Sequence, residues 1–294
     1  MSFSKDMSVI IPARNEAACI RRTLSAVLDS AAFFQRADKG CLHLGKSPVE
    51  VLVVDNQSTD ETGTIVQEYA RSHGVRWIRC HQLGAPCARN WGTRQATGSL
   101  LVFLDADTRI PLAGLQRIFH LVRSLGYEAG IFTLQGEPDT WSSRRWWTFW
   151  NVVRLLPLAK AKALPAFMFC TRAAFDRFGP FDETVQIGEE WPILAGLYRH
   201  CPERLIYDRS LTAVTSNRRM TLQRYGYTKM LLKYVWAVLH RSGRNGYPDT
   251  FREQSGTGGD ERPDVLASPR SDGPRRSTPP AARNHIGCRL RDRA

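Results

Sequence analysis

Two aspartates separated by one residue follow an apolar run in the first half of the chain. Leu100–Leu104 has the continuous apolar pattern of a buried strand, and Asp105 and Asp107 come directly after it. Carboxylates this close repel one another unless a cation or hydrogen-bond donors lie between them. Oxygen ligands of this kind suit Mg²⁺ or Mn²⁺ shared with a substrate's phosphates. We therefore predict a metal site at Asp105 and Asp107, with an exposed acid pair as the competing interpretation.

Polar residues also follow two other predicted strands. Pro12, Ala13, Arg14 and Glu16 come after a strand over residues 7–11, and Asp55 comes after a strand over residues 49–54. In open α/β sheets, ligands bind outside the carboxyl ends of the strands. We therefore expect the three strand ends to form one site.

The elements that would position these residues alternate between strand and helix. Apolar periodicity predicts helices over residues 16–28, 59–73 and 85–97, with Ser58 or Thr59 capping the second, and a short strand over 75–78. Residues 31–48 are predicted to be a long connection. This alternation indicates an α/β fold with a mostly parallel, Rossmann-like sheet and helices on both faces.

Common nucleotide-binding motifs are missing from the sequence. No G-x-G-x-x-G follows the first strand, and no G-x-x-x-x-G-K-[ST] occurs. A bound nucleotide would therefore be recognised by carboxylates and a metal ion.

Composition limits the class of protein. The 294 residues include seven cysteines without C-x-x-C spacing, no run of 18 apolar residues and no N-terminal secretory pattern. These features predict reduced thiols and a cytoplasmic protein, with contact to the inner face of a membrane left open. The net charge of +13 suits an anionic partner, although a generally basic surface explains it equally well.

The C-terminal part differs in composition from the rest. It is rich in Gly, Ser, Pro and Arg and has almost no apolar periodicity. Such a segment cannot bury enough surface to become ordered. We predict a catalytic domain over residues 1–245 and a low-complexity basic tail over 246–294 that is disordered. Nucleic-acid binding by the tail is less favoured, because no aromatic residues interleave with its arginines.

Several motifs together resemble the family-2 glycosyltransferases of the GT-A fold, in the nucleotide-diphospho-sugar transferase superfamily. They occur in order between about residues 7 and 200, and they read Val9-Ile-Ile-Pro-Ala-Arg-Asn-Glu16, Val53-Val-Asp-Asn-Gln-Ser-Thr-Asp-Glu-Thr62, Gly84-Ala-Pro-Cys-Ala-Arg-Asn-Trp-Gly92, Phe103-Leu-Asp-Ala-Asp107, Phe175-Asp-Arg-Phe-Gly-Pro-Phe-Asp-Glu183 and Gly188-Glu-Glu-Trp191.

The resemblance implies a set of residues that bind a nucleotide-diphosphate sugar. Asp107 would ligate the metal together with Asp105, and the remaining donor-binding positions would be Pro12, Ala13, Arg14, Glu16, Asp55, Gly84, Arg89, Asn90, Asp105 and Ala106. Two alternatives remain open. Asp55 would instead form an Asx-turn or a helix cap, and Arg89 and Asn90 would be solvated on a helix surface.

The implied reaction is inverting transfer of a hexosyl group to an acceptor hydroxyl, with a carboxylate as general base. In the family the base is the acid that ends a Gly-Glu-Asp motif, and this sequence has Gly188-Glu189-Glu190. Glu190 is therefore the predicted base, and Glu189 is the alternative. Glu in place of Asp moves the carboxylate by roughly an ångström, which matters for positioning. Both could also act only as charges at the N-terminus of a helix that begins at Trp191.

The acceptor side is less defined. Residues 141–169 and 225–240 combine aromatic and basic residues, and three interpretations remain: membrane-interface helices, ordinary core helices, or surfaces for stacking sugar rings. Arg218 and Arg219 follow the last predicted strand and would clamp the diphosphate or lie in a solvated turn. The acceptor would be a sugar or a lipid-linked molecule; nucleic acid is not expected.

Two other function classes remain open at this point. One is a nucleotidyltransferase, which would need a Gly-rich basic loop where this chain has Pro12 to Glu16. The other is a non-catalytic basic protein that binds membrane or RNA. The sequence does not specify the sugar, the nucleotide, the acceptor or the oligomeric state.

Overall fold

The computed structural model describes residues 5–37, 48–156, 166–185, 188–221 and 226–239, apart from the side chains of Lys5, Arg219 and residues 237–239. All of these lie within one unit of the chain, Met1–Pro248. The predicted tail over 246–294, and residues 38–47 of the predicted connection, fall outside the described residues.

An eight-stranded sheet forms the centre of this unit, in the order β3-β2-β1-β4-β7-β6-β8-β5. Its strands are β1 (Lys5–Ala13), β2 (Val49–Asp55), β3 (Arg76–Arg79), β4 (Gly98–Leu104), β5 (Thr108–Arg109), β6 (Ala129–Glu137), β7 (Phe167–Thr171) and β8 (Leu205–Ser216). The first four in this order are parallel, and β7 runs antiparallel between β4 and β6. The sheet is thus mixed and mostly parallel, as expected.

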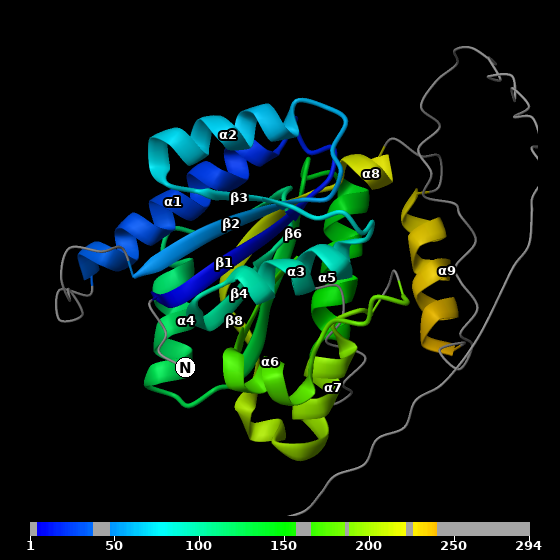
Figure 1. Cartoon of the computed structure of the whole chain (residues 1–294). Helices are drawn as coiled ribbons and strands as arrows, with labels where there is room; N and C mark the ends of the chain where they lie inside the picture. Colours follow the sequence, from blue (N-terminus) through cyan, green and yellow to red (C-terminus); the bar gives the residue numbers. More distant parts are fainter. Residues whose placement is uncertain (1–4, 38–47, 157–165, 186–187, 222–225, 240–294) are drawn as a thin grey trace, which may run out of the picture. The chain divides into compact units, whose positions relative to one another are not determined.

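Helices cover both faces of the sheet (Figure 1). Side chains alternate along β1, so that Val9 packs with α1, α2 and α4, whereas Ile10 packs with α3, α6 and α7. The helices are α1 (Ile20–Ala37), α2 (Thr62–His73), α3 (Ala85–Gln95), α4 (Gly114–Arg123), α5 (Trp141–Val153), α6 (Arg172–Phe178), α7 (Trp191–His200), α8 (Arg218–Thr221) and α9 (Gly226–Leu239), with a 3-10 turn, η2 (Pro202–Arg204).

Strand β1 has β2 and β3 on one side and β4 on the other, so the direction in which the chain adds strands to the sheet changes at β1. At such a switch point the loops after two neighbouring strands diverge to opposite faces and leave a crevice, where ligands bind in open α/β sheets. The loop after β1 and the loop that carries Asp105 and Asp107 leave the same edge of the sheet, since β1 and β4 are parallel neighbours, and Cys19 of the first loop lies in the field of Asp107 of the second.

Two predicted helix boundaries are wrong. Helix α1 begins at Ile20, not at residue 16, and it continues to Ala37 because Phe34 packs on Phe119 with ring centroids 5.0 Å apart. Part of the predicted 31–48 connection is therefore helical. Helix α2 begins at Thr62, with Glu61 as N-cap in place of Ser58 or Thr59. The Thr59 amide is instead bonded to Asn15, which ties the two loops together.

Among the described helices, none combines the length and the apolar character that crossing a bilayer requires.

Candidate active site

The loops after β1 and β2 are bonded to each other at the switch point. Asn15 has a left-handed backbone (φ 54°), and its Oδ1 accepts hydrogen bonds from the Thr59 amide (2.8 Å) and the Thr59 hydroxyl (3.3 Å). The Asn15 amide donates to Ser58 Oγ over 3.2 Å. A left-handed non-glycine residue persists where its surroundings fix it, and such residues cluster at functional sites. The loop that contains Arg14 and Glu16 therefore has a defined position.

Asp55 ends β2 and is buried, with 7% of its surface exposed. Its Oδ1 accepts a hydrogen bond from the Ser58 amide at 2.9 Å, which is the turn contact that the sequence left open. The predicted role of Asp55 in nucleotide binding remains a prediction. The neighbouring Asn56, which the sequence did not single out, donates to the Gln82 carbonyl (2.6 Å) and accepts from the Gly84 amide (2.8 Å). It thereby fixes the start of α3, where Gly84 has a φ of 131°.

Arg89 lies on the buried side of α3 and joins two acids from distant parts of the chain. Its Nη2 is 2.7 Å from Asp105 Oδ1, and its Nη1 is 2.6 Å from Glu189 Oε1. The guanidinium also lies 5.6 Å from the Phe181 ring centroid. Burial favours a lower pKa for Arg89, but Asp105 and Glu189 outweigh it and raise that pKa. The alternative of a solvated Arg89 is therefore wrong.

Asn90 is buried as well, so the solvated interpretation is wrong for this residue too. Its Nδ2 donates to the Phe181 carbonyl (2.9 Å) and to Glu183 Oε1 (2.8 Å), while its Oδ1 accepts from the Phe181 amide (2.9 Å). These bonds hold the segment before α7 against α3. Asn90 therefore fixes the segment that leads to Glu189, and its predicted contact with a donor stays a prediction.

Hydrogen bonds to three other segments of the chain fix the backbone of Asp105, Ala106 and Asp107. The Asp105 amide donates to Ala166, the Ala106 carbonyl accepts from Thr23 Oγ1 at 2.8 Å, and the Asp107 carbonyl accepts from the Ser216 amide at 3.1 Å. The Asp107 carboxylate lies 3.4 Å from the hydroxyls of Thr108 and Thr215. The two carboxylates are thus positioned by rigid elements of the sheet.

Glu16 and Arg218 come from opposite ends of the described chain and form an ion pair. Arg218 also donates to the Asn15 carbonyl at 3.3 Å. The half-buried Cys19 thiol lies in the field of Arg218, Glu16 and Asp107, and burial is the main cause of its raised pKa. Arg218 therefore lies in the loop cluster around Asp107, and its predicted contact with a diphosphate stays a prediction.

The remaining predicted donor-site residues differ in exposure. Pro12 is half-buried, Ala13 is buried and Arg14 is exposed. The side chain of Arg219 is outside the described part of the structure.

Glu189 and Glu190 precede α7, after Gly188 with a φ of 81°. A Cβ on Gly188 would lie 2.5 Å from the Trp191 ring, so this turn requires glycine. The Glu189 side chain is 14% exposed, and burial raises its pKa against the opposing effect of Arg89. Glu190 is 3% exposed and is the N-cap residue of α7.

Arg154, which the sequence analysis missed, is buried next to this pair of acids. It donates to Asn151 Oδ1 at 2.8 Å, and burial lowers its pKa against the opposing charges of Tyr207, Tyr234 and Glu190. A single arginine within the apolar run of residues 149–158 was the signal that could have identified it.

The acids at the switch point can hold a divalent cation only together with oxygen ligands from a substrate. Within the described ranges, no group of three or more His, Cys, Asp or Glu residues could hold a metal ion by itself. Mg²⁺ and Mn²⁺ sites of enzymes that use phosphorylated substrates need only one or two carboxylates, because the substrate supplies further oxygens. Asp107 and Asp105 meet that requirement when a diphosphate is bound.

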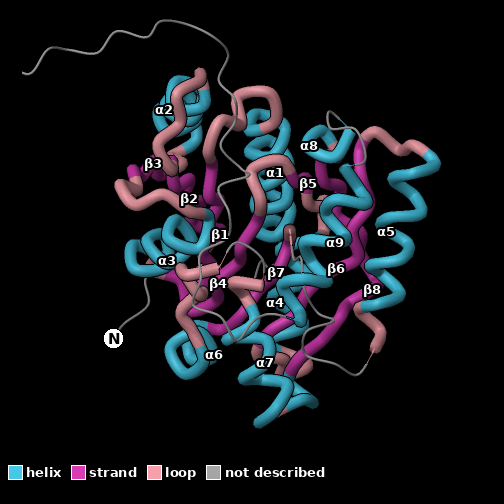
Figure 2. Tube along the Cα trace, turned by 90° about the vertical axis from the view of Figure 1, so that its right-hand side faces the viewer, coloured by secondary structure: helices cyan, strands magenta, loops and turns pink. Residues whose placement is uncertain are grey.

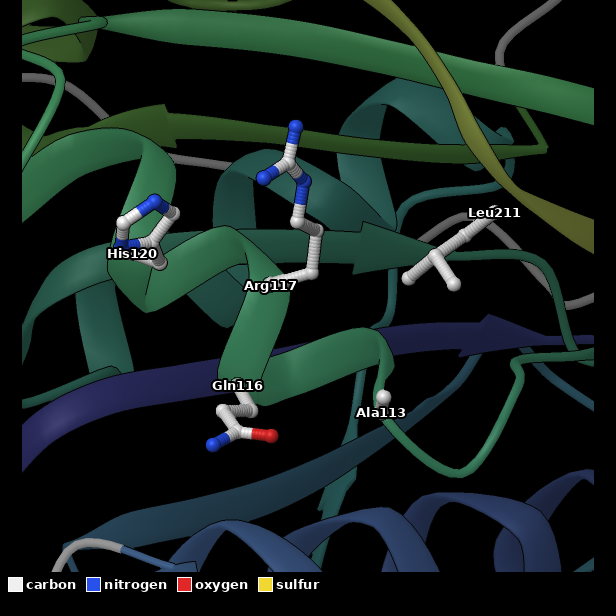
Figure 3. Close-up of a pocket in the computed structure, with 5 residues that line it drawn as sticks. All are labelled: Ala113, Gln116, Arg117, His120 and Leu211. Atoms are coloured by element: carbon white, nitrogen blue, oxygen red, sulfur yellow. The ribbon is translucent and has the colours of Figure 1, made fainter.

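A separate pocket of about 300 Å³ lies between α4 and β8, lined by Ala113, Gln116, Arg117, His120 and Leu211 (Figure 3). It contains none of the predicted site residues. Its arginine is already paired with Asp208, since Arg117 Nε lies 2.6 Å from Asp208 Oδ2. We assign no role to it.

The sequence is similar to known proteins over more than half of its length. Residues 8–184 match the family model described as Glycosyl transferase family 2. Glycosyltransferase AglE of Haloferax volcanii is 38% identical over 103 residues, which are 34% of this chain and 30% of that protein. An undecaprenyl-phosphate 4-deoxy-4-formamido-L-arabinose transferase of an Enterobacter species is 30% identical over 142 residues, or 47% of this chain and 40% of that protein. The chain thus matches less than half the length of these relatives.

Solved structures show the same fold. A mannosyltransferase from Pyrobaculum calidifontis, in complex with GDP-Man and Mn²⁺, has a TM-score of 0.55 at 22% identity over 83% of this chain and 68% of that chain. Glucosyl-3-phosphoglycerate synthase from Mycobacterium tuberculosis, in complex with Mn²⁺, UDP and glucosyl-3-phosphoglycerate, has a TM-score of 0.52 at 19% identity over 84% and 82%. The GT-A fold predicted from the sequence is confirmed.

Proposed function

The chain belongs to glycosyl transferase family 2, and from this premise we propose that it is an inverting, metal-assisted hexosyltransferase that moves a sugar from a nucleotide-diphosphate donor to an acceptor hydroxyl. One observation carries the proposal. Arg89 holds Asp105 on the donor side and Glu189 on the acceptor side with the two nitrogens of one guanidinium, at the switch point of the sheet. We assign this activity to residues 1–245.

The donor would bind across the loops after β1, β2 and β4. Asp55 would contact the base or ribose, and Arg89 would reach the base or diphosphate. The segment from Pro12, at the end of β1, to Glu16 would line the pocket. Arg218 would move between Glu16 and the diphosphate, since an arginine fork matches both carboxylate and phosphate. Asp107 and Asp105 would hold the cation, which supplies positive charge against the diphosphate that leaves the sugar.

Glu190 is the proposed base. An acceptor hydroxyl is a weak nucleophile, and a carboxylate that takes its proton contributes typically ~10²–10⁴-fold in rate. Glu190 is buried, and the Gly188 turn and α7 fix its position. We expect this fixed position to compensate for the side chain of Glu being longer than that of Asp. Glu189 would hold Arg89 in place through the 2.6 Å ion pair, and it is the alternative base.

The acceptor is a sugar or a lipid-linked molecule. Two related proteins carry names that refer to polyprenyl phosphates, undecaprenyl-phosphate in one and dolichyl-phosphate in the other. Another is named validoxylamine A glucosyltransferase, a name that does not refer to a polyprenyl phosphate. This range among relatives means that the acceptor has to be identified directly.

The proposal is tested by incubating the protein with a panel of nucleotide sugars and Mn²⁺. Release of a nucleoside diphosphate with one donor is the expected result, whereas formation of a nucleoside triphosphate from a nucleotide sugar and added pyrophosphate would indicate a nucleotidyltransferase. Asp107→Asn should remove metal-dependent nucleotide binding, measured by calorimetry with and without Mn²⁺. Unchanged metal-dependent affinity in Asp107→Asn would contradict the metal assignment. No turnover with any donor, together with no nucleotide affinity, would favour a non-catalytic binding protein.

A further inference from the structure

Large apolar side chains are exposed on two neighbouring helices. Phe149 and Val152 on α5, and Leu155 just after it, are 48%, 57% and 51% exposed. On α9, Leu232, Val235 and Trp236 are 65%, 44% and 43% exposed. We call these six residues the α5–α9 face.

The two helices pack against each other through their other sides. Trp150 of α5 lies 4.3 Å from Tyr234 of α9, and Trp146 lies 5.6 Å from Tyr227, between ring centroids. Figures 1 and 2 both show α5 and α9 next to one another. Aromatic contacts therefore already join the two helices, while the six residues of the α5–α9 face keep much of their surface exposed.

The charged side chains on the two helices themselves are all basic. Arg144 and Arg145 are exposed on α5, and Lys229 is exposed on α9 next to the half-buried Lys233. Neither Trp141–Leu156 nor Gly226–Leu239 contains an Asp or Glu residue. Arg145 stacks on the exposed Trp141 ring at 4.5 Å, and the acid Asp139, just before α5, pairs with Arg144.

From this combination we infer that the α5–α9 face docks on an anionic lipid bilayer, with its apolar side chains in the headgroup region. Helices that lie in a membrane interface carry Trp, Phe and Leu on one side and Lys or Arg beside them. A protein partner fits less well, since lysine is depleted in protein–protein interfaces. The charge pattern matches the negative surface of a membrane that contains acidic lipids.

The buried sides of the two helices adjoin the candidate site. Trp147 of α5 donates from Nε1 to Asn217 Oδ1 at 2.9 Å, and the residue after Asn217, Arg218, forms the ion pair with Glu16. Tyr234 of α9 packs on Trp191, with ring centroids 6.3 Å apart, and Trp191 directly follows Glu190. A docked bilayer would therefore be separated from the site by α5 and α9.

The test is flotation of the full-length protein with phosphatidylcholine vesicles, with and without about one third phosphatidylglycerol, which supplies the negative surface. We expect binding only to the anionic vesicles. Leu232→Glu should lower the partition coefficient by roughly tenfold, as expected when an exposed leucine no longer enters the interface. Leu125→Glu is the matched control, because Leu125 is 52% exposed and lies after α4; it should bind as the wild type does.

Two results would overturn the inference. One is a wild-type protein that does not float with the anionic vesicles. The other is Leu232→Glu binding as well as Leu125→Glu, which would assign binding to other basic parts of the chain. Val152→Glu repeats the test on α5, and melting curves of all three variants show that each is folded.

Discussion

Arg89 shows how one residue can connect two halves of a site. An arginine with 10% of its side chain exposed needs partners for its charge, because an unpaired buried ion is strongly destabilising. Its partners here are Asp105, 16 residues away along the chain, and Glu189, 100 residues away. The Asp105 carboxylate and the loop that carries Glu189 thus share one positive charge, and the position of either depends on the other.

The two adjacent glutamates can be separated by experiment. Glu190→Gln should reduce transfer by about 10²–10⁴-fold, because a general base is lost, with donor affinity nearly unchanged. Glu189→Gln should instead weaken donor binding, because Arg89 loses one of its two ionic partners. Steady-state kinetics and calorimetry with the donor would measure both effects. A large loss of transfer with intact donor affinity in Glu189→Gln, and not in Glu190→Gln, would reverse the two roles.

Helix α3 illustrates how an element places a functional residue. Gly92 follows Arg89 by three residues and faces the sheet, where an added Cβ would lie 2.6 Å from Ile10 Cγ2 and 2.8 Å from Val54 Cγ2. Only a glycine lets α3 approach β1 and β2 this closely. The depth of α3 in turn sets the position of Arg89.

Gly92→Ala should therefore destabilise the protein by about 1–3 kcal/mol, the usual cost of overpacking a core. It should also weaken donor binding, because Arg89 moves with the helix. Urea unfolding measures the first effect and calorimetry the second.

Gly63→Ala is the control. Gly63 is also helical, but a Cβ added there would lie at an ordinary contact distance of 3.4 Å from Trp77 Cζ2. Its free energy of unfolding should stay the same or rise by up to about 1 kcal/mol, since alanine favours helix. Equal effects at both positions would contradict this account of α3.

The strands that bear the donor side could be predicted from the sequence, and the reason is visible in their residues. Continuous apolar runs such as Val51–Val54 are buried on both faces, so a short, unbroken run rich in β-branched residues identifies them. Asp55, Asp105 and Asp107 follow from these runs. Helix starts were less predictable, because contacts between distant loops decide them; the bond from the Thr59 amide to Asn15 is an example.

The acceptor side depended more on tertiary structure. Strand β7 is antiparallel and lies between β4 and β6, an order that no local pattern specifies. Arg154 and Asn217 are buried polar residues that each interact with another element, Arg154 with Tyr207 of β8 and Asn217 with Trp147 of α5. Their roles therefore appear only when α5 is packed. The pairing of Arg89 with Glu189 was likewise beyond reach of spacing arguments.

At the scale of the whole molecule, the sheet has an ionic network at the end opposite the candidate site. Glu50 is buried near the start of β2 and accepts hydrogen bonds at Oε1 from Ser8 Oγ (2.6 Å) and the Thr97 amide (2.5 Å). Its Oε2 lies 2.8 Å from Arg76 Nη1. One carboxylate thus ties together β1, β2, β3 and the residue before β4. These contacts hold the strands that carry the site in register at the opposite end of the sheet.

This network makes stability depend on pH in a defined direction. Burial alone would raise the pKa of Glu50, but the hydrogen bonds from Ser8, Thr97 and Arg76 outweigh it and hold that pKa below the ordinary value of 4.5. A carboxyl whose pKa is lower in the folded state stabilises the protein fully above its unfolded pKa, and this contribution is lost as the pH falls through the folded pKa.

Glu50→Gln should therefore lower the free energy of unfolding by about 1–3 kcal/mol near neutral pH, because partners of a buried charge lose their bonds. The difference from the wild type should shrink below about pH 4.5. Urea unfolding at a series of pH values measures it, with Glu68→Gln as the control, since the half-exposed pair of Glu68 with Arg21 contributes little. A difference that stays constant down to the acid transition would show that Glu50 acts through its shape and not through its charge.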